Sequence, residues 1–216
     1  MRWLEPLRTY LGDVVSPLRC AACNGALRRR TLLCTVCAGT VIRWEREGDP
    51  LAFGHYGGAL ATTLLRLKYA SRPDLALPLG QLLRSVVLAK LAPEDVDVVV
   101  PVPVPFARLV ERGYNQAALI ARPLVGPLSA RFAPRALGRR EGSIKQAALN
   151  RRERLENLRD AFVPRQPEKV RGRRVLLVDD VSTTGATLAA CRAVLASCGA
   201  AEVHGAVVAR TESLDL

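Results

Sequence analysis

The sequence is poor in aromatic residues and in long apolar runs. Phe, Trp and Tyr make up 5% of the 216 residues, and no segment reaches the roughly 18 uncharged apolar residues that a membrane-spanning helix needs. The N-terminal residues also lack the uninterrupted apolar stretch of a signal peptide. These absences exclude a membrane-spanning protein and predict a cytoplasmic location. Since 49% of the residues are nevertheless hydrophobic, we expect a globular protein with a sizeable core.

Two common nucleotide-binding motifs are missing as well. The sequence contains neither G-x-x-x-x-G-K-[ST] nor G-x-G-x-x-G, the loops that hold phosphates in P-loop and dinucleotide-binding proteins. It also contains no internal repeat and no low-complexity tract. Any phosphate-binding loop in this chain must therefore be of another kind.

The basic residues are concentrated in one part of the chain. The net charge is +12, yet residues 101–174 alone hold seventeen basic and six acidic residues, which gives +11. Residues 175–216 hold two basic and five acidic residues and carry −3. A local basic region beside an acidic one suggests a polyanionic partner, such as a phosphate, a pyrophosphate or nucleic acid. An Arg-rich solvated surface would give the same composition.

Four of the six cysteines have the spacing of a metal site. Cys20, Cys23, Cys34 and Cys37 form two C-x-x-C pairs separated by ten residues. Four thiolates in tetrahedral coordination are typical of structural Zn²⁺, and a site filled by four protein ligands leaves no open position for catalysis. An iron centre or a pair of redox disulfides are the alternatives. We expect an N-terminal helix and zinc-binding module over residues 1–45 and a second domain over residues 46–216.

The second domain alternates between strands and helices. Apolar, β-branched runs predict strands at residues 51–56, 96–102, 174–178 and 202–209, and a further strand after residue 130. Helical spacing predicts helices at residues 57–69, 73–91, 114–124, 147–158 and 185–198. Residues 103–113, 138–145 and 179–184 are expected to be loops. This alternation predicts an α/β fold with a parallel sheet, whose ligands bind at the carboxyl ends of the strands.

The segment Val175–Thr187 has the features of a phosphate loop. A buried strand ends in Asp179 and Asp180, and a small, hydroxyl-rich loop then leads into a helix. Glycine and small side chains let backbone N–H groups approach a phosphate, and the helix N-terminus favours an anion. The two carboxylates would repel a phosphate but suit the vicinal hydroxyls of a ribose. The candidate phosphate contacts are Ser182, Thr183, Thr184, Gly185, Ala186 and Thr187. A threonine-rich helix cap is the alternative interpretation.

These thirteen residues resemble the signature of the type I phosphoribosyltransferases. The resemblance implies that Asp179 and Asp180 hold the ribose of phosphoribosyl pyrophosphate, that the threonine-glycine loop holds its 5-phosphate, and that Mg²⁺ bridges ribose and pyrophosphate oxygens. In that family, the loop corresponding to residues 98–105 meets the pyrophosphate. The basic residues placed around such a site are Lys68, Arg108, Arg112, Arg139, Arg140 and Lys145. Guanidinium groups suit a diphosphate, although surface positions would explain them equally.

Further segments resemble a narrower family. The segments at residues 67–75 (LKYASRPDL), 101–117 (PVPVPFARLVERGYNQA) and 143–162, together with the two C-x-x-C pairs, are similar to the ComF family. That family is linked to natural competence and the uptake of transforming DNA. The resemblance leaves three functions open: a competence protein that binds phosphoribosyl pyrophosphate and contacts single-stranded DNA, an active phosphoribosyltransferase of nucleotide salvage or synthesis, and a zinc-module adaptor for a DNA helicase or translocase.

Overall fold

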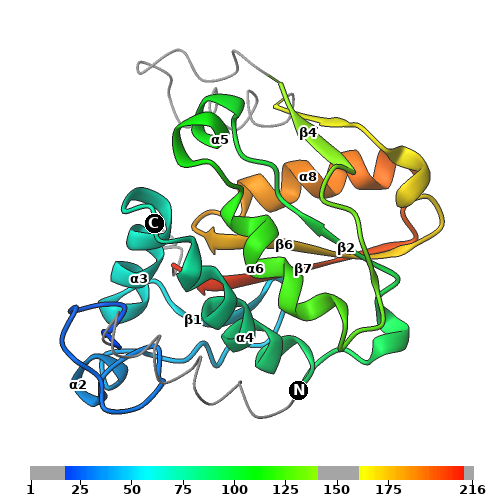
Figure 1. Ribbon diagram of the computed structural model, residues 1–216. Helices are drawn as coiled ribbons and strands as arrows, with labels where there is room; N and C mark the ends of the chain where they lie inside the picture. The colour runs from blue at the N-terminus through cyan, green and yellow to red at the C-terminus, as the bar shows by residue number, and fades with distance from the viewer. Residues whose placement is uncertain (1–17, 141–160, 212–216) are drawn as a thin grey trace, which may run out of the picture.

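The computed structural model describes residues 18–140 and 161–211, and its centre is a five-stranded parallel sheet (Figure 1). The predicted N-terminal helix, the helix at residues 147–158 and Lys145 lie outside the described residues. The strand order is β1-β7-β6-β2-β3. The strands are β1 Leu51–His55, β7 Glu202–Arg210, β6 Arg174–Ser182, β2 Val98–Pro101 and β3 Arg131–Phe132. The predicted parallel α/β sheet is therefore confirmed.

Helices cover both faces of the sheet, which is why its central strands are continuous apolar runs rather than alternating ones. One core contains Leu176 and Val178 of β6 and side chains of α3 Gly58–Tyr69, α4 Ala76–Val87 and α6 Gln116–Val125. The other core contains Val175 and Leu177 and side chains of α8 Ala186–Ser197. Figure 1 shows α8 across the strands from α4 and α6. The successive residues of β6 thus point alternately into two different cores.

All three of the expected loops contain some regular structure, since Gly138 and Arg139 of the predicted loop at residues 138–145 belong to strand β4, Leu137–Arg139. Residues 103–113 include helix α5, Phe106–Arg112, which ends at Gly113 with a φ of +81°. Strand β6 continues to Ser182 because its pairing with β7 extends through Val181↔Ala209 and Ser182↔Arg210. The acidic pair therefore belongs to the strand and not to the loop. A partner strand overrode the local preference of aspartate, which is poor in strands.

A small hairpin and several short helical turns complete the fold. Strand β4, Leu137–Arg139, pairs antiparallel with β5, Phe162–Pro164. The sequence indicated neither β5 nor the separation of β3 from β4. The short 3₁₀ turns are η1 Pro73–Leu75, η2 Pro93–Asp95 and η3 Pro167–Lys169. No helix in the described part of the chain is long and apolar enough to cross a bilayer.

Candidate functional site: the carboxyl end of β6

Asp179 and Asp180 lie side by side near the end of β6, and both are buried, with 8% and 3% of their surfaces exposed. Neighbouring strand residues point to opposite faces of a sheet, so the two carboxyl groups belong to different environments. The backbone N–H of Asp180 donates to Asp179 Oδ1 over 2.8 Å. Two adjacent buried acids are costly to ionise together, which makes this position a candidate functional site.

Asp180 meets a lysine from a distant part of the chain. Lys68, near the end of α3, places its Nζ 2.6 Å from Asp180 Oδ2. Two residues fix the last turn of α3: Arg112 Nε donates to the carbonyl oxygen of Lys68 over 2.8 Å, and the Tyr114 hydroxyl donates to that of Leu67. The structure thus brings Lys68 together with the acidic pair.

Asp179 points toward α8 and the β4–β5 hairpin. Burial raises the pKa of its carboxyl well above the ordinary value, and the neighbouring charge of Asp180 adds to this increase. Burial also lowers the pKa of the Arg139 guanidinium. The guanidinium of Arg139 stacks over the Phe162 ring at 5.2 Å. Arg139 therefore packs within the β4–β5 hairpin, on the side of the sheet toward which Asp179 points.

The segment Ser182–Thr187 connects β6 to α8 and surrounds a cavity of about 140 Å³. Gly185, with a φ of +76°, is the N-cap of α8, a conformation that glycine adopts without strain. Thr184 Oγ1 accepts the N–H of Ala186 over 3.4 Å. The N–H groups of the first turn of a helix lack intrahelical partners and attract anions. The six predicted phosphate contacts therefore line one small cavity beside the acidic pair.

The two arginines of α5 have different surroundings. Arg108 Nη1 pairs with Glu111 Oε2 at 2.6 Å on the exposed surface of the helix. Arg112 is part-buried: besides Lys68, it donates to Gln116 Oε1, and its guanidinium lies 5.7 Å from the centre of the Tyr69 ring. Arg112 thus contacts α3, a role that the sequence pattern did not indicate because the two segments are 44 residues apart.

The four predicted metal ligands come together at the other end of α3. The Sγ atoms of Cys20, Cys23, Cys34 and Cys37 all lie within 4.8 Å of one another, and those of Cys23 and Cys34 are 3.8 Å apart. A tetrahedral zinc site with bonds of about 2.3 Å has edges of about 3.8 Å. The geometry and the donor type therefore fit Zn²⁺, and this cluster can hold a metal ion.

The pKa values of two of these thiols are shifted in opposite directions. Although burial opposes ionisation, backbone N–H groups of Cys23 and Cys34 lower the pKa of Cys20 to about 6. Hydrogen bonding to Cys34 raises the pKa of Cys37 to about 12. Four neighbouring thiols cannot all ionise unless a positive charge balances them, and a bound Zn²⁺ would supply that charge.

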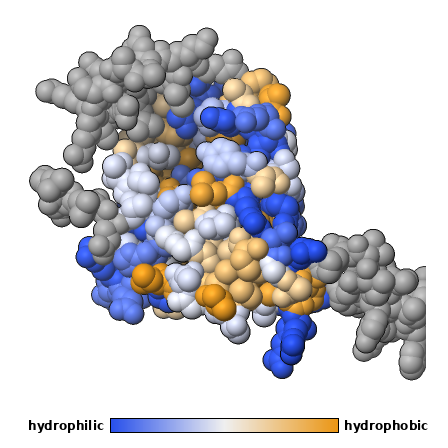
Figure 2. Space-filling model, turned by 90° about the vertical axis from the view of Figure 1, so that its left-hand side faces the viewer, coloured by the Kyte–Doolittle hydropathy of each residue, from blue (hydrophilic) through white to orange (hydrophobic). Residues whose placement is uncertain are grey.

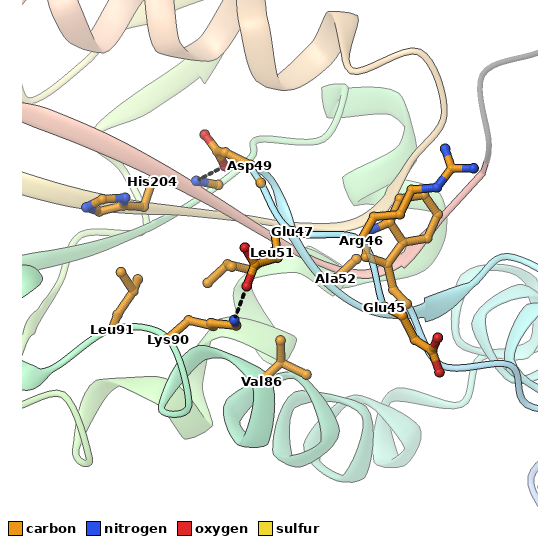
Figure 3. Close-up of a pocket in the computed structure, with 13 residues that line it drawn as sticks. Glu45, Arg46, Glu47, Asp49, Leu51, Ala52, Val86, Lys90, Leu91 and His204 are labelled. Atoms are coloured by element: carbon orange, nitrogen blue, oxygen red, sulfur yellow. Dashed lines mark hydrogen bonds and ion pairs between the residues drawn. The ribbon is translucent and has the colours of Figure 1, made fainter. Parts of the chain in front are cut away.

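A larger cavity of about 430 Å³ lies beside β1, toward the opposite ends of the strands (Figure 3). It is lined by residues 44–49, the end of α4 and the start of β7. Two of its carboxylates have partners: Lys90 Nζ lies 2.9 Å from Glu47 Oε1, and Asp49 Oδ1 accepts the N–H of Gly205 over 2.8 Å. This cavity is separate from the acidic pair and contributes nothing to that site.

Comparison with known proteins identifies the class to which this fold and site belong. Residues 85–214 match the family model of the phosphoribosyl transferase domain. The chain is therefore a member of the phosphoribosyltransferase fold family, as its β6–α8 segment indicated.

The full-length relatives narrow this assignment. The DNA utilization protein YhgH of Escherichia coli strain K12 is 31% identical over 209 residues, which cover 89% of this chain and 90% of that protein. Competence protein F of Haemophilus influenzae is 28% identical over 86% of this chain and 81% of its own length. Competence protein ComFC of Bacillus subtilis is 31% identical over 62% of this chain and 52% of its own length. The chain belongs to the ComF family.

Proposed function

We propose that this chain binds phosphoribosyl pyrophosphate, or a closely related sugar phosphate, at the carboxyl end of β6. The observation that carries the proposal is the buried acidic pair, with Lys68 on Asp180, directly beside the phosphate loop. Ribose hydroxyls would donate to the carboxylates, and the 5-phosphate would accept N–H groups from the first turn of α8. The proposed phosphate contacts are Ser182, Thr183, Thr184, Gly185, Ala186 and Thr187.

The residues around the site fit a ligand that arrives with Mg²⁺. This ion keeps several waters and is usually held by one or two carboxylates and by the phosphates of the substrate. Asp180 already pairs with Lys68. We therefore propose that the ligand supplies most of the oxygen atoms that coordinate Mg²⁺, and that the protein orients the ribose. When bound, Mg²⁺ would neutralise charge on the pyrophosphate. Arg108, and Lys145 outside the described residues, are proposed as diphosphate contacts, and Arg112 supports Lys68.

Calorimetry of the full-length protein tests this proposal. We expect phosphoribosyl pyrophosphate with Mg²⁺ to give a binding isotherm, and Asp180→Asn to weaken binding by about tenfold or more, which corresponds to the loss of a hydrogen bond to a charged group. Glu168→Gln removes an exposed carboxylate on η3 and serves as the control with unchanged affinity. If the parent protein gives no binding heat at several temperatures, the proposal fails.

At the level of the cell, we propose a role in the uptake or processing of transforming DNA, on the cytosolic side. The names of two relatives, competence protein F and ComFC, support this role, and the third is named a DNA utilization protein. The cysteine module, by which we mean residues 18–45 with the four clustered cysteines, exposes Val36 and Ile42. This exposure favours the module as the contact for a partner such as a helicase or translocase.

Single-stranded DNA is the proposed polyanionic partner of the basic region. Phe106 on α5 and Tyr69 at the end of α3 are 59% and 65% exposed, and Arg108 lies on the same short helix. Figure 2 shows the face of the molecule that lies on the left in Figure 1, and apolar side chains, in orange, are visible there at the height of α5. Aromatic rings beside cationic groups suit stacked bases and backbone phosphates.

A DNA-binding assay at several salt concentrations tests this surface. We expect the affinity to fall steeply with salt, because phosphate contacts release counterions. Phe106→Ala should weaken binding by about 1 kcal/mol or more, the usual effect of losing one stacking ring. Val36→Ala, at another exposed apolar position, on the cysteine module, is the control. A flat salt response would remove the basis for phosphate contacts.

Phosphoribosyl transfer is the second candidate, and the intact acidic pair beside the phosphate loop favours it. In that reaction a nucleophile attacks the anomeric carbon, a bond from that carbon to the acceptor forms, and the carbon–oxygen bond to pyrophosphate breaks. The protein would hold the ribose and the 5-phosphate and needs no covalent intermediate. Release of pyrophosphate in the presence of one of a panel of bases and amines would support transfer.

A further inference from the structure

The cysteine module lies against the N-terminal end of α3, and Thr40 forms hydrogen bonds to both of them. Thr40 follows the module's short helix α2, Thr35–Ala38. Its hydroxyl donates to the carbonyl oxygen of Cys37 over 2.8 Å and accepts the N–H of Ala59 over 2.9 Å. One hydroxyl therefore joins the backbone of a metal ligand to an N–H of the first turn of α3, which has no partner within its own helix.

The contact between the module and α3 is close. Gly58, the first residue of α3, has a φ of +49°, and a Cβ at this position would lie 2.6 Å from the carbonyl oxygen of Thr40 and 2.7 Å from its Oγ1. Ala59 also packs into the small apolar cluster that contains Cys20 and Ala22. The cap residue of α3, Gly57, has no side chain to bond the helix, so Thr40 takes over this role from outside the helix.

The other end of α3 carries Lys68, which pairs with Asp180. A helix of twelve residues is about 18 Å long, so a tilt of about 3° at its first turn moves its last turn by about 1 Å. Displacements of this size change the strength of an oriented polar contact. A tilt of α3 that begins at Thr40 would therefore displace the lysine at the candidate ligand site.

We infer that Thr40 is a positioning residue for the ligand site: through α3, it couples metal binding at the four cysteines to the placement of Lys68 on Asp180. The affinity consequence rests on the proposed function, because it concerns the same acidic pair. By thermodynamic reciprocity, the metal raises the affinity for the ligand by the same factor by which the ligand raises the affinity for the metal.

Amide hydrogen exchange on the full-length, metal-loaded protein tests the coupling without any ligand. Thr40→Val keeps the volume and removes the hydroxyl, and we expect exchange at residues 66–70 to become about fivefold faster or more, the lower end of usual coupling factors. Thr40→Ser keeps the hydroxyl and should restore the parent rate. In the matched control Thr62→Val, the lost hydroxyl bonds only to Gly58 of the same helix in the structure described, and residues 66–70 should keep their rate.

Ligand binding provides a second, separate measurement. We expect Thr40→Val to raise the dissociation constant for phosphoribosyl pyrophosphate with Mg²⁺ by about fivefold. With Co²⁺ bound at the four cysteines, adding the ligand should change the visible absorption of Thr40→Val less than that of the parent protein. If the parent binds no phosphoribosyl pyrophosphate, the proposed function fails while the exchange data still decide the coupling. Faster exchange confined to residues 57–62 in Thr40→Val would overturn the inference.

Discussion

Lys68 Nζ lies 2.6 Å from Asp180 Oδ2, and this contact joins the end of α3 to the end of β6 across 112 residues of sequence. Both side chains are largely withdrawn from water, with 21% and 5% of their side-chain surfaces exposed. A buried carboxylate that loses its partner is strongly destabilising. The ion pair therefore contributes to the stability of the fold as well as to the proposed ligand site.

Replacing Lys68 by methionine should lower the free energy of unfolding by about 2 to 3 kcal/mol, because Asp180 is left buried and unpaired. The double variant Lys68→Met/Asp180→Asn should recover most of this loss, since no charge then remains without a partner. Denaturant unfolding measures both effects as a double-mutant cycle.

The matched control for this cycle is Lys90→Met, which breaks the exposed ion pair with Glu47. Pairs of this kind contribute about 1 kcal/mol or less, so the variant should remain close to the parent protein. Equal losses in Lys68→Met and Lys90→Met would contradict the importance assigned to the buried pair.

Asp179→Asn should make the protein more stable at neutral pH. Burial and the charge of Asp180 raise the pKa of Asp179 in the folded state, whereas an unfolded aspartate titrates near about 3.9. Between the unfolded and the folded pKa values, Asp179 is protonated in the folded protein and ionised in the unfolded one. The free energy of unfolding therefore falls as the pH rises through this window. The asparagine variant avoids this loss and should gain on the order of 1 kcal/mol above the window.

Unfolding curves at several pH values check this expectation for Asp179→Asn. The gain should disappear below about pH 4, where the carboxyl is protonated in both states. Glu168→Gln should show no such dependence. If Asp179→Asn gains stability and loses ligand affinity, it shows the usual trade-off of a functional site. If Asp179→Asn is less stable than the parent protein at neutral pH, the prediction is wrong.

Gly185→Ala should weaken ligand binding and cost about 1 to 2 kcal/mol of stability, the penalty for a side chain in left-handed backbone. No atom lies within 4 Å of the position of a Cβ at Gly185, so the effect would come from the φ of +76° alone. Gly126 has equal space but a φ of −63°. Gly126→Ala should therefore be neutral or slightly stabilising, and thermal unfolding of both variants compares them directly.

Cys34→Ser should remove a stoichiometric metal ion and expose residues 18–40 to protease, because a structural zinc site contributes directly to folding. Elemental analysis should find one zinc per parent chain. Cys198→Ser is the control, since Cys198 is buried against α8 and β7 residues far along the chain from the four-cysteine cluster. A parent protein without bound metal, yet with the same protease pattern, would refute a structural zinc.

Much of this protein could be predicted from local sequence. The parallel sheet followed from the β-branched runs and the helical spacing between them, and the phosphate loop followed from its acidic pair, hydroxyls and glycine. The two C-x-x-C pairs predicted a cluster that the structure brings within metal-binding distance. In each case the signal lies within a few neighbouring residues, where spacing along the chain fixes spacing in space.

The prediction of a loop at residues 179–184 was wrong because the strand pairing that decides its structure involves a distant segment. Asp179 and Asp180 are strand residues because β7 continues alongside them, and nothing within their own segment indicates that partner. Helix α5, residues 106–112, was missed for another reason: Phe106, Leu109 and Val110 have helical spacing, but the segment is short and lies between prolines and Gly113, and none of its side chains is buried.

The sequence by itself therefore determined the parallel sheet, the candidate phosphate loop and the four cysteines that can hold a metal ion. Only the tertiary structure decided that Lys68 reaches Asp180, that Arg112 holds α3, and that Thr40 joins the cysteine module to the same helix. The physical reason is the same for all three contacts. Each is a polar contact between segments that are distant in sequence, and such a contact exists only after burial of the apolar faces has brought the segments together.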